Sequence, residues 1–309
     1  MRIQFENVDF SSRSGPNGFG LKLARHFISM GHELTNESSN VRLSFIQSRN
    51  DFSPTVLRLD GIYFNSAQNW EKMNEPILSS YRHADAVIVQ SKFDQKLIET
   101  FFGSRKNLYV IHNGTDFDAI DRILPAEINV EREKVWMCAS AWRPHKRLID
   151  NVRLFQKLSQ EDHIMLVAGR DSQQHLSEHN IVDDRIKILG DLSWPQLISC
   201  MKASKFFVHL SWLDHCPNVV IDARAAGCKI FCSSEGGTKE VAGLDASVVK
   251  EGTWKMMPTR LYEPPPISEF LLTQNQSFQP SINIRDVALK YESVLRKLVD
   301  ETENNNQHA

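Results

Sequence analysis

The sequence predicts an α/β protein made of two doubly wound domains, and three observations lead to this fold class. Short apolar runs alternate with segments of helical periodicity along most of the 309 residues, a pattern typical of βαβ units around a parallel sheet. The alternation stops over the charged, proline-containing stretch 119–133 and then resumes. The length also suits two domains of ordinary size better than one.

The first predicted domain spans residues 1–118. Its short buried strands are predicted at Arg2–Phe5, Val41–Phe45, Thr55–Leu59, Ala86–Gln90 and Leu108–Ile111. Its helices are predicted at Leu21–Met30, Ile77–His83 and Lys92–Phe101. The segment SSRSGPNGFG before the first helix is predicted to be a loop whose glycines let the backbone approach a ligand, with a helix start that favours an anion.

Residues 119–133 are interpreted as a linker, and residues 134–280 as the second domain. Its strands are predicted at Lys134–Ser140, Ile164–Ala168, Ile186–Leu189, Phe206–Leu210 and Lys229–Cys232. Its helices are predicted at Leu148–Leu158, Trp194–Ser204 and Asn218–Ala226. A last helix is expected within 281–301, and the polar tail 302–309 is expected to be disordered. A ligand of such a domain should lie beyond the carboxyl ends of the strands.

Composition excludes several classes of function. The chain is 41% hydrophobic and 24% charged with a formal net charge of −2, so it offers no electrostatic reason to bind nucleic acid. We expect no transmembrane segment, because no apolar run approaches the roughly 20 residues that span a bilayer. The start MRIQFENVDF resembles a strand rather than a secretory signal. Five cysteines without C-x-x-C spacing favour reduced thiols and a cytoplasmic location.

The most informative stretch runs from Val208 to Gly243, where Asp214 and Asp222 stand eight positions apart. Asp214 begins a tight connection that ends at Pro217, and a helix then starts. The first amides of that helix, at Asn218 and Val219, lack intrahelical partners and suit phosphate oxygens. Asp222 lies one turn in, where a carboxylate can accept hydrogen bonds from vicinal hydroxyls. This arrangement predicts a pocket for a nucleotide-sugar.

A loop acid and a solvated helix acid could produce the same spacing by chance. The segments CPNVVIDARAAG and SSEGGTKEVAG around and after the two acids favour the functional interpretation. A zinc site at His209, His215 and Cys216 is not expected, because their spacing matches no standard zinc pattern. We therefore predict no metal site.

This pattern resembles the acidic-x7-acidic motif of the retaining family 4 glycosyltransferases of GT-B fold, also called glycosyl transferases group 1. That motif is commonly Glu-x7-Glu, followed by an Ala-Ala-Gly helix end, a strand and a Gly-Gly turn, whereas both acids are Asp here. The resemblance covers roughly residues 1–245, most specifically 135–243. It implies two Rossmann-like domains facing across a cleft, with the C-terminal helix crossing back to the first domain.

The segment SAWRPHKR follows the first strand of the second domain, where the family usually places an Arg and a Lys against the donor diphosphate. Arg143 and Lys146 match these positions best, and Arg147 is a possible substitute for the lysine. A planar guanidinium and a point-charge ammonium together suit two phosphates. The alternative is that these cations only form a solvated surface and bind no ligand.

Other strand ends supply weaker candidates. Arg170 is either a phosphate contact or a surface residue, and Asp191 and Leu192 stand where relatives hold the nucleobase through backbone groups. Gly18 lies in the glycine loop that resembles the one facing the donor pyrophosphate. Asp60 either fills the position of a cleft-facing histidine in relatives or caps the following turn.

The resemblance implies a hexosyl- or pentosyltransferase that moves a sugar from a nucleotide-sugar to an acceptor hydroxyl with retention of configuration. The donor would be a UDP- or GDP-sugar, and no other cofactor is expected. Asp214 would orient the sugar and Asp222 the ribose, without a metal. The acceptor would be a glycan, a lipid-linked sugar or, less favoured, nucleic acid. The alternatives are a glycosyltransferase acting on a hydroxylated DNA base, a sugar-nucleotide epimerase and a non-catalytic nucleotide-sugar-binding module.

Overall fold

The computed structural model describes residues 1–12, 14–52 and 54–307 and divides the chain into two compact units. Unit 1 comprises Met1–Asp116, Met256–Thr259 and Ser281–Ala309, and unit 2 comprises Phe117–Lys255 and Arg260–Pro280. No helix in the described ranges combines the length and apolar character needed to pass through a lipid bilayer.

Unit 1 contains a parallel sheet with the strand order β2-β1-β3-β4-β5-β6. Its strands are β1 (Arg2–Glu6), β2 (Glu33–Leu34), β3 (Val41–Phe45), β4 (Thr55–Leu59), β5 (Ala86–Val89) and β6 (Leu108–Val110). Every strand predicted for this half is present, with ends that agree with the prediction to within one residue. Only the two-residue edge strand β2 was not predicted. Because β1 lies between β2 and β3, the order of the sheet reverses at the β1/β3 pair.

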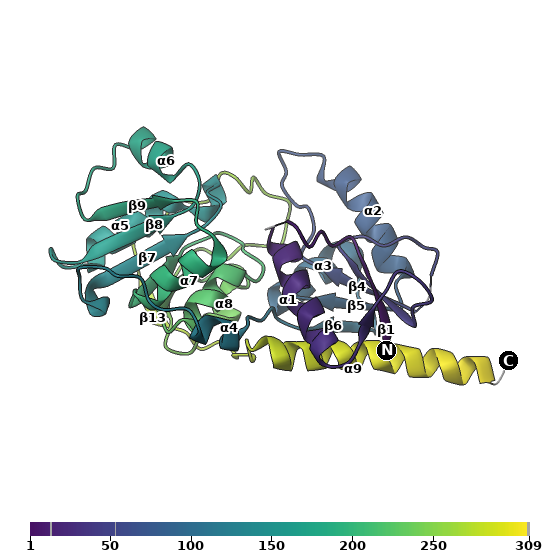
Figure 1. Cartoon of the computed structure of the whole chain (residues 1–309). Coiled ribbons are helices and arrows are strands. Elements are labelled where there is room, and N and C mark those ends of the chain that lie inside the picture. Colours follow the sequence, from purple (N-terminus) through teal and green to yellow (C-terminus); the bar gives the residue numbers. More distant parts are fainter. Residues whose placement is uncertain (13, 53, 308–309) are drawn as a thin grey trace. The chain divides into compact units, whose positions relative to one another are not determined.

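The helices of unit 1 are α1 (Gly15–Ser29), α2 (Trp70–His83), α3 (Lys92–Phe102) and α9 (Ile284–Gln307). Figure 1 shows α9, in yellow, running beside α1, in purple, along the sheet of this unit. Apolar residues of α9 such as Tyr291 and Leu295 are fully buried with Phe27 of α1 and Leu43 of β3. The expected return of the last helix to the first domain is therefore confirmed.

The predicted loop around Gly18 is wrong in extent, because α1 begins at Gly15 rather than at Leu21. Pro16 stands in the first turn, where its fixed φ and missing N–H fit a helix start. Gly20 lies against Val8, which follows β1, and Phe45 of β3: an added Cβ would come within 2.8 Å of Val8 Cγ1 and 3.5 Å of the Phe45 ring. This glycine serves close packing of a helix rather than a loop.

The predicted disordered tail also differs from the structure, because α9 continues from Glu301 to Gln307. Residues such as Glu301 and Glu303 are exposed, and polar residues on a solvated helix face need no core to remain helical when the preceding turns are anchored. Residues 308–309 lie outside the described residues.

Unit 2 contains a second sheet with the order β13-β12-β11-β10-β7-β8-β9, parallel except for the edge strand β13. Its strands are β7 (Val135–Ala139), β8 (Ile164–Ala168), β9 (Ile186–Gly190), β10 (Phe206–His209), β11 (Lys229–Ser233), β12 (Ser247–Val249) and β13 (Leu272–Gln274). Its α-helices are α4 (Phe117–Asp121), α5 (Leu148–Leu158), α6 (Ser172–Glu178), α7 (Trp194–Lys202) and α8 (Asn218–Ala225). The sequence missed α4, α6, β12 and β13, which are short. The order of this sheet reverses between β7 and β10, which is where doubly wound sheets bind ligands.

The stretch 119–133 is not a free linker but part of unit 2. It contains the end of α4 and the start of a 3-10 helix, η1 (Arg132–Lys134). Lys202 of α7 donates to the carbonyls of Asp121 and Ile123, and Ser199 bonds the carbonyl of Leu124. These bonds explain why a charged segment without regular periodicity still packs on a domain.

Candidate functional site

The candidate site lies at the β7/β10 switch point of unit 2. Strand β7 is followed by the 3-10 helix η2 (Pro144–Lys146), and β10 is followed by the connection to α8. Asn151 of α5 joins these two segments, because it accepts from the Leu210 amide at 2.8 Å and donates to the Lys146 carbonyl at 3.2 Å. The Trp212 amide also donates to the His145 carbonyl at 2.8 Å. The backbones that carry Lys146 and the first acid of the motif are thus held together.

Lys146, His209 and Asp214 form a compact charged cluster there. Lys146 Nζ lies 2.5 Å from Asp214 Oδ2, and His209 Nε2 lies 2.9 Å from the same oxygen. Burial alone would raise the pKa of Asp214, but Lys146 and His209 hold it well below its ordinary value. Burial lowers the pKa of His209 despite the nearby carboxylate. Asp214 is therefore ionised and His209 neutral near pH 7.

A glycine turn completes the wall beside Asp214. Gly236 has a φ of +95° and forms a bridge with Asp214, whose carbonyl accepts from the Gly237 amide at 2.7 Å. A Cβ on Gly236 would lie 2.7 Å from that carbonyl oxygen. Only glycine combines this backbone conformation with this close approach, so the predicted Gly-Gly turn has a definite packing reason.

Several polar groups around this cluster have no hydrogen-bond partner among the described residues. They are His145 Nδ1, Ser211 Oγ and Thr238 Oγ1, all buried. Burial and, next, the charge of Lys146 lower the pKa of His145 to about 3, so the imidazole is neutral. Arg143 is exposed, and no hydrogen bond or ion pair occupies its guanidinium within the described chain. Buried polar groups are nearly always paired, so this concentration of unpaired ones indicates a ligand site.

The second acid, Asp222, lies one turn into α8 and is 4% exposed. Its Oδ2 accepts a hydrogen bond from Trp194 Nε1 at 2.9 Å. Pro217 is the N-terminal cap residue of α8, and its carbonyl accepts from Val220 at 3.1 Å. The Val219 amide has no acceptor in the part of the chain that the structure describes, as expected for the first turn of a helix.

Arg147 does not substitute for Lys146. Its guanidinium is buried, where it bonds Glu251 at 2.6 Å and the Pro265 carbonyl at 2.7 Å. It thereby links the residue that follows η2 to the proline-rich segment 264–266. The residue adopts a left-handed φ of 53°, which turns its side chain into the domain. This arrangement leaves Lys146 and Arg143 as the cations of the site.

The remaining predicted residues lie elsewhere. Arg170 and Asp191, at the ends of β8 and β9, face each other at 3.5 Å on the surface, and Leu192 beside them is half-buried. Gly18 and Asp60 belong to unit 1. Asp60 pairs with the guanidinium of the fully buried Arg58, so it takes part in an internal network and does not merely cap a turn.

Sequence reasoning missed three members of the site. His209 ends the apolar strand β10, and from the sequence it was weighed only as part of a zinc site, which its spacing did not support. Asn151 lies on the buried face of α5, and Trp194 begins α7. A polar residue on a buried face was the signal available for His209 and Asn151. Nothing local connects Trp194 with Asp222.

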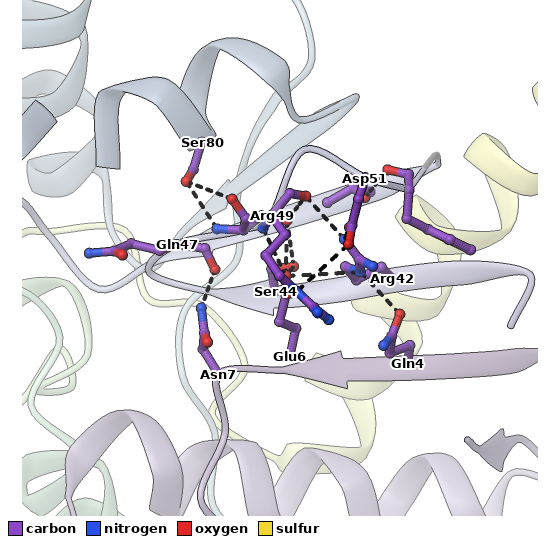
Figure 2. A network of polar contacts seen from close by, with 12 residues as sticks. Gln4, Glu6, Asn7, Arg42, Ser44, Gln47, Arg49, Asp51 and Ser80 are labelled. Atoms are coloured by element: carbon purple, nitrogen blue, oxygen red, sulfur yellow. Dashed lines mark hydrogen bonds and ion pairs between the residues drawn. The ribbon is translucent and has the colours of Figure 1, made fainter. Parts of the chain in front are cut away.

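Figure 2 shows a second polar network, at the β1/β3 switch point of unit 1. Glu6 accepts from Ser44 Oγ at 2.6 Å and from Arg49 Nε at 2.6 Å. Arg42 bonds Asp51 at 2.6 Å and the Arg49 carbonyl at 3.0 Å. Burial would raise the pKa of Glu6, but its hydrogen bonds hold it below the ordinary value. The network fastens the loop after β3 to the sheet.

Comparison with known proteins adds the following. Residues 120–261 match the family model of glycosyl transferases group 1. The sucrose-phosphate synthase of Thermosynechococcus elongatus is similar in structure, with a TM-score of 0.71 and 13% identity over 97% of this chain and 100% of that one. HepE of Anabaena in complex with UDP-glucose has a TM-score of 0.62 and 14% identity over 99% and 100%. A glycosyltransferase of Rickettsia africae has a TM-score of 0.61 and 14% identity over 100% and 99%. No curated protein sequence matches.

Proposed function

We propose that the chain, which matches the family model of glycosyl transferases group 1 over residues 120–261 and has the GT-B fold, is a glycosyltransferase whose unit 2 binds a nucleotide-sugar and transfers its sugar. The donor is a UDP- or GDP-sugar, the acceptor group is a hydroxyl, and the anomeric configuration is retained. One observation carries the proposal: at the β7/β10 switch point, buried polar groups and the guanidinium of Arg143 have no partner among the residues that the structure describes. The binding of UDP-glucose by the similar HepE supports a uridine donor.

In this proposal the leaving diphosphate lies between η2 and the start of α8. Arg143 and Lys146 stabilise the negative charge that develops on the leaving oxygen, together with the Val219 amide. Preorganised charges of this kind usually supply the largest part of transition-state stabilisation. They take the role that a divalent cation has in other transferases, and we therefore propose that turnover does not require added metal.

The two acids bind the remainder of the donor. Asp214 accepts hydrogen bonds from the sugar through Oδ1, since the described protein groups bond only Oδ2. Asp222 accepts from the ribose hydroxyls, and Arg170, Asp191 and Leu192 border the nucleobase. Retention rests on the likeness of the paired acids to the retaining family, and the anomeric proton signals of the product would test it directly.

The test of donor binding is a thermal-shift panel with UDP-, GDP-, ADP- and TDP-glucose, repeated with Asp222→Ala. A donor present at 100 times its dissociation constant stabilises the fold by about 2.7 kcal/mol. We expect one donor to raise the melting temperature of the wild type, and the variant to lose that rise. Glu178→Ala, which removes an exposed acid of α6, should keep it. No shift with any donor would contradict the proposal and favour a protein that has lost donor binding.

A further inference from the structure

We propose that His209 is a positioning residue for the transfer reaction, holding Asp214 so that one carboxylate oxygen stays on Lys146 while the other serves the donor sugar. The geometry that carries this is the shared contact at Asp214 Oδ2, with Lys146 Nζ at 2.5 Å and His209 Nε2 at 2.9 Å. The inference rests on the proposed function, because it assigns a role within the same site.

The direction of the histidine hydrogen bond follows from its partner. An ionised carboxylate has only acceptors, and Lys146 keeps Asp214 ionised, as the lowered pKa of that carboxyl indicates. The proton must therefore reside on Nε2 of His209. The imidazole is neutral because burial lowers its pKa, so it supplies a donor without adding a second cation beside Lys146.

The two oxygens of Asp214 are consequently in different states. Oδ2 receives both internal donors, and Oδ1 receives none from the described residues. The side chain of Asp214 is 12% exposed, whereas that of His209 is 4% exposed. A carboxylate held by two donors on one oxygen has lost its freedom to rotate. Its other oxygen is then preorganised for a sugar hydroxyl, and such fixed geometry is a main source of catalytic rate.

His209 is not needed to hold the surrounding backbone. Asn151 already joins the Leu210 amide to the Lys146 carbonyl, and the Trp212 amide bonds the carbonyl of His145. Substituting the imidazole should therefore release the Asp214 side chain while the strand end stays in place. This separation makes the positioning role testable apart from folding.

The experiment compares wild type with His209→Leu and His209→Gln. Glutamine can return an N–H near the position of Nε2, whereas leucine cannot. The matched control is His163→Leu, which removes a different half-buried histidine of unit 2 whose partner is Trp136. For each protein we would measure binding of UDP, GDP, ADP and TDP, and sugar release from their glucose esters.

Because hydrogen bonds to charged groups contribute strongly, His209→Leu should lower kcat by about 10- to 100-fold. Nucleoside diphosphate affinity should change by less than about 3-fold, since the lost bond acts on the sugar side. His209→Gln should recover most of kcat, and His163→Leu should retain it. Equal losses in the Leu and Gln variants, or a loss of diphosphate affinity that matches the loss of kcat, would overturn the positioning role. Wild type that binds none of the four diphosphates would instead overturn the proposed function and this inference with it.

Discussion

Each sheet has one switch point, and the polar groups at the two switch points differ in how completely they are hydrogen-bonded within the chain. In unit 1, Glu6 at the end of β1 has both carboxylate oxygens engaged by its own chain, by Ser44 on one and Arg49 on the other. In unit 2, one oxygen of Asp214 and the guanidinium of Arg143 are left without a partner from the described residues. We call the network around Glu6 closed, because both of its carboxylate oxygens are bonded within the chain. We call the cluster around Asp214 open, because one of its oxygens has no partner among the described residues.

This difference in hydrogen bonding separates polar groups that stabilise the fold from polar groups that are available to bind a ligand. A buried polar group that is fully hydrogen-bonded contributes to stability, whereas one left unpaired costs free energy unless something else binds it. A cluster of charged side chains is thus no sign of a binding site by itself. The internal bonds of the Glu6 network argue for a structural role, and the unpaired groups around Asp214 argue for a donor site.

The largest expected effect is on the open region. Lys146→Ala removes the cation proposed to stabilise the leaving diphosphate and leaves Asp214 without its ion-pair partner. We expect kcat to fall by about 100- to 1000-fold, the usual cost of losing one such group. Lys187→Ala, an exposed lysine of β9, is the matched control and should be close to wild type. Near-normal turnover of Lys146→Ala in a sugar-release assay would show that the open cluster is not the reaction centre.

The next effect should appear in the closed network. Glu6→Ala removes the acceptor of Ser44 and Arg49, and we expect it to lower the free energy of unfolding by about 2 kcal/mol. Binding of the nucleoside diphosphate should be unchanged. Glu33→Ala removes the acid of an exposed pair with Arg2 and should cost less than about 1 kcal/mol. Urea denaturation measures both. A Glu6 variant with normal stability and weakened donor binding would reverse the comparison.

The smallest effect concerns mild acid, to which the two regions should respond differently. His145 has a pKa of about 3 in the folded protein, below the ordinary value of 6.5. Between these two pH values the imidazole is protonated in the unfolded chain and neutral in the folded one. The contribution of the neutral His145 to the free energy of unfolding is complete above pH 6.5. It is lost as the pH falls below that value, by up to about 1.4 kcal/mol per pH unit. Glu6 has a pKa below its ordinary value, so it stays ionised between pH 7.5 and pH 5.5.

Hydrogen exchange at pH 7.5 and pH 5.5, corrected for intrinsic rates, would measure this response. Protection of β10 amides should fall at the lower pH, and His145→Gln should reduce that fall. An identical pH response in the variant would mean that His145 is not buried in its neutral form, which would remove one of the unpaired groups from the site.

Much of the fold was predictable because its signal is local. The runs Val41–Phe45, Thr55–Leu59 and Ile164–Ala168 are apolar segments of strand length, and the structure has strands over these same residues. Helix α5 likewise begins and ends where its periodicity does. The elements that were missed, such as β12 and β13, have three residues each and are too short to show a period.

The site was predictable only in part. The paired acids and the cationic turn after β7 are sequence patterns, so Lys146 and Asp214 could be singled out and are found in contact. The sequence favoured Lys146 but left Arg147 as a possible substitute, because what excludes Arg147 is its left-handed backbone and its contact with Glu251. Likewise, the loop around Gly18 could not be recognised as helix without its packing on β1 and β3.

The sequence by itself thus determined the α/β class, the division into two domains and the residues of the acidic motif, since periodicity and motif spacing are properties of neighbouring residues. Only the tertiary structure decided which polar groups satisfy one another. His209, Asn151 and Lys146 stand on different elements and meet because β7 and β10 pair in one particular register. Hydrogen bonds between such distant segments depend on that pairing, and no local pattern encodes it.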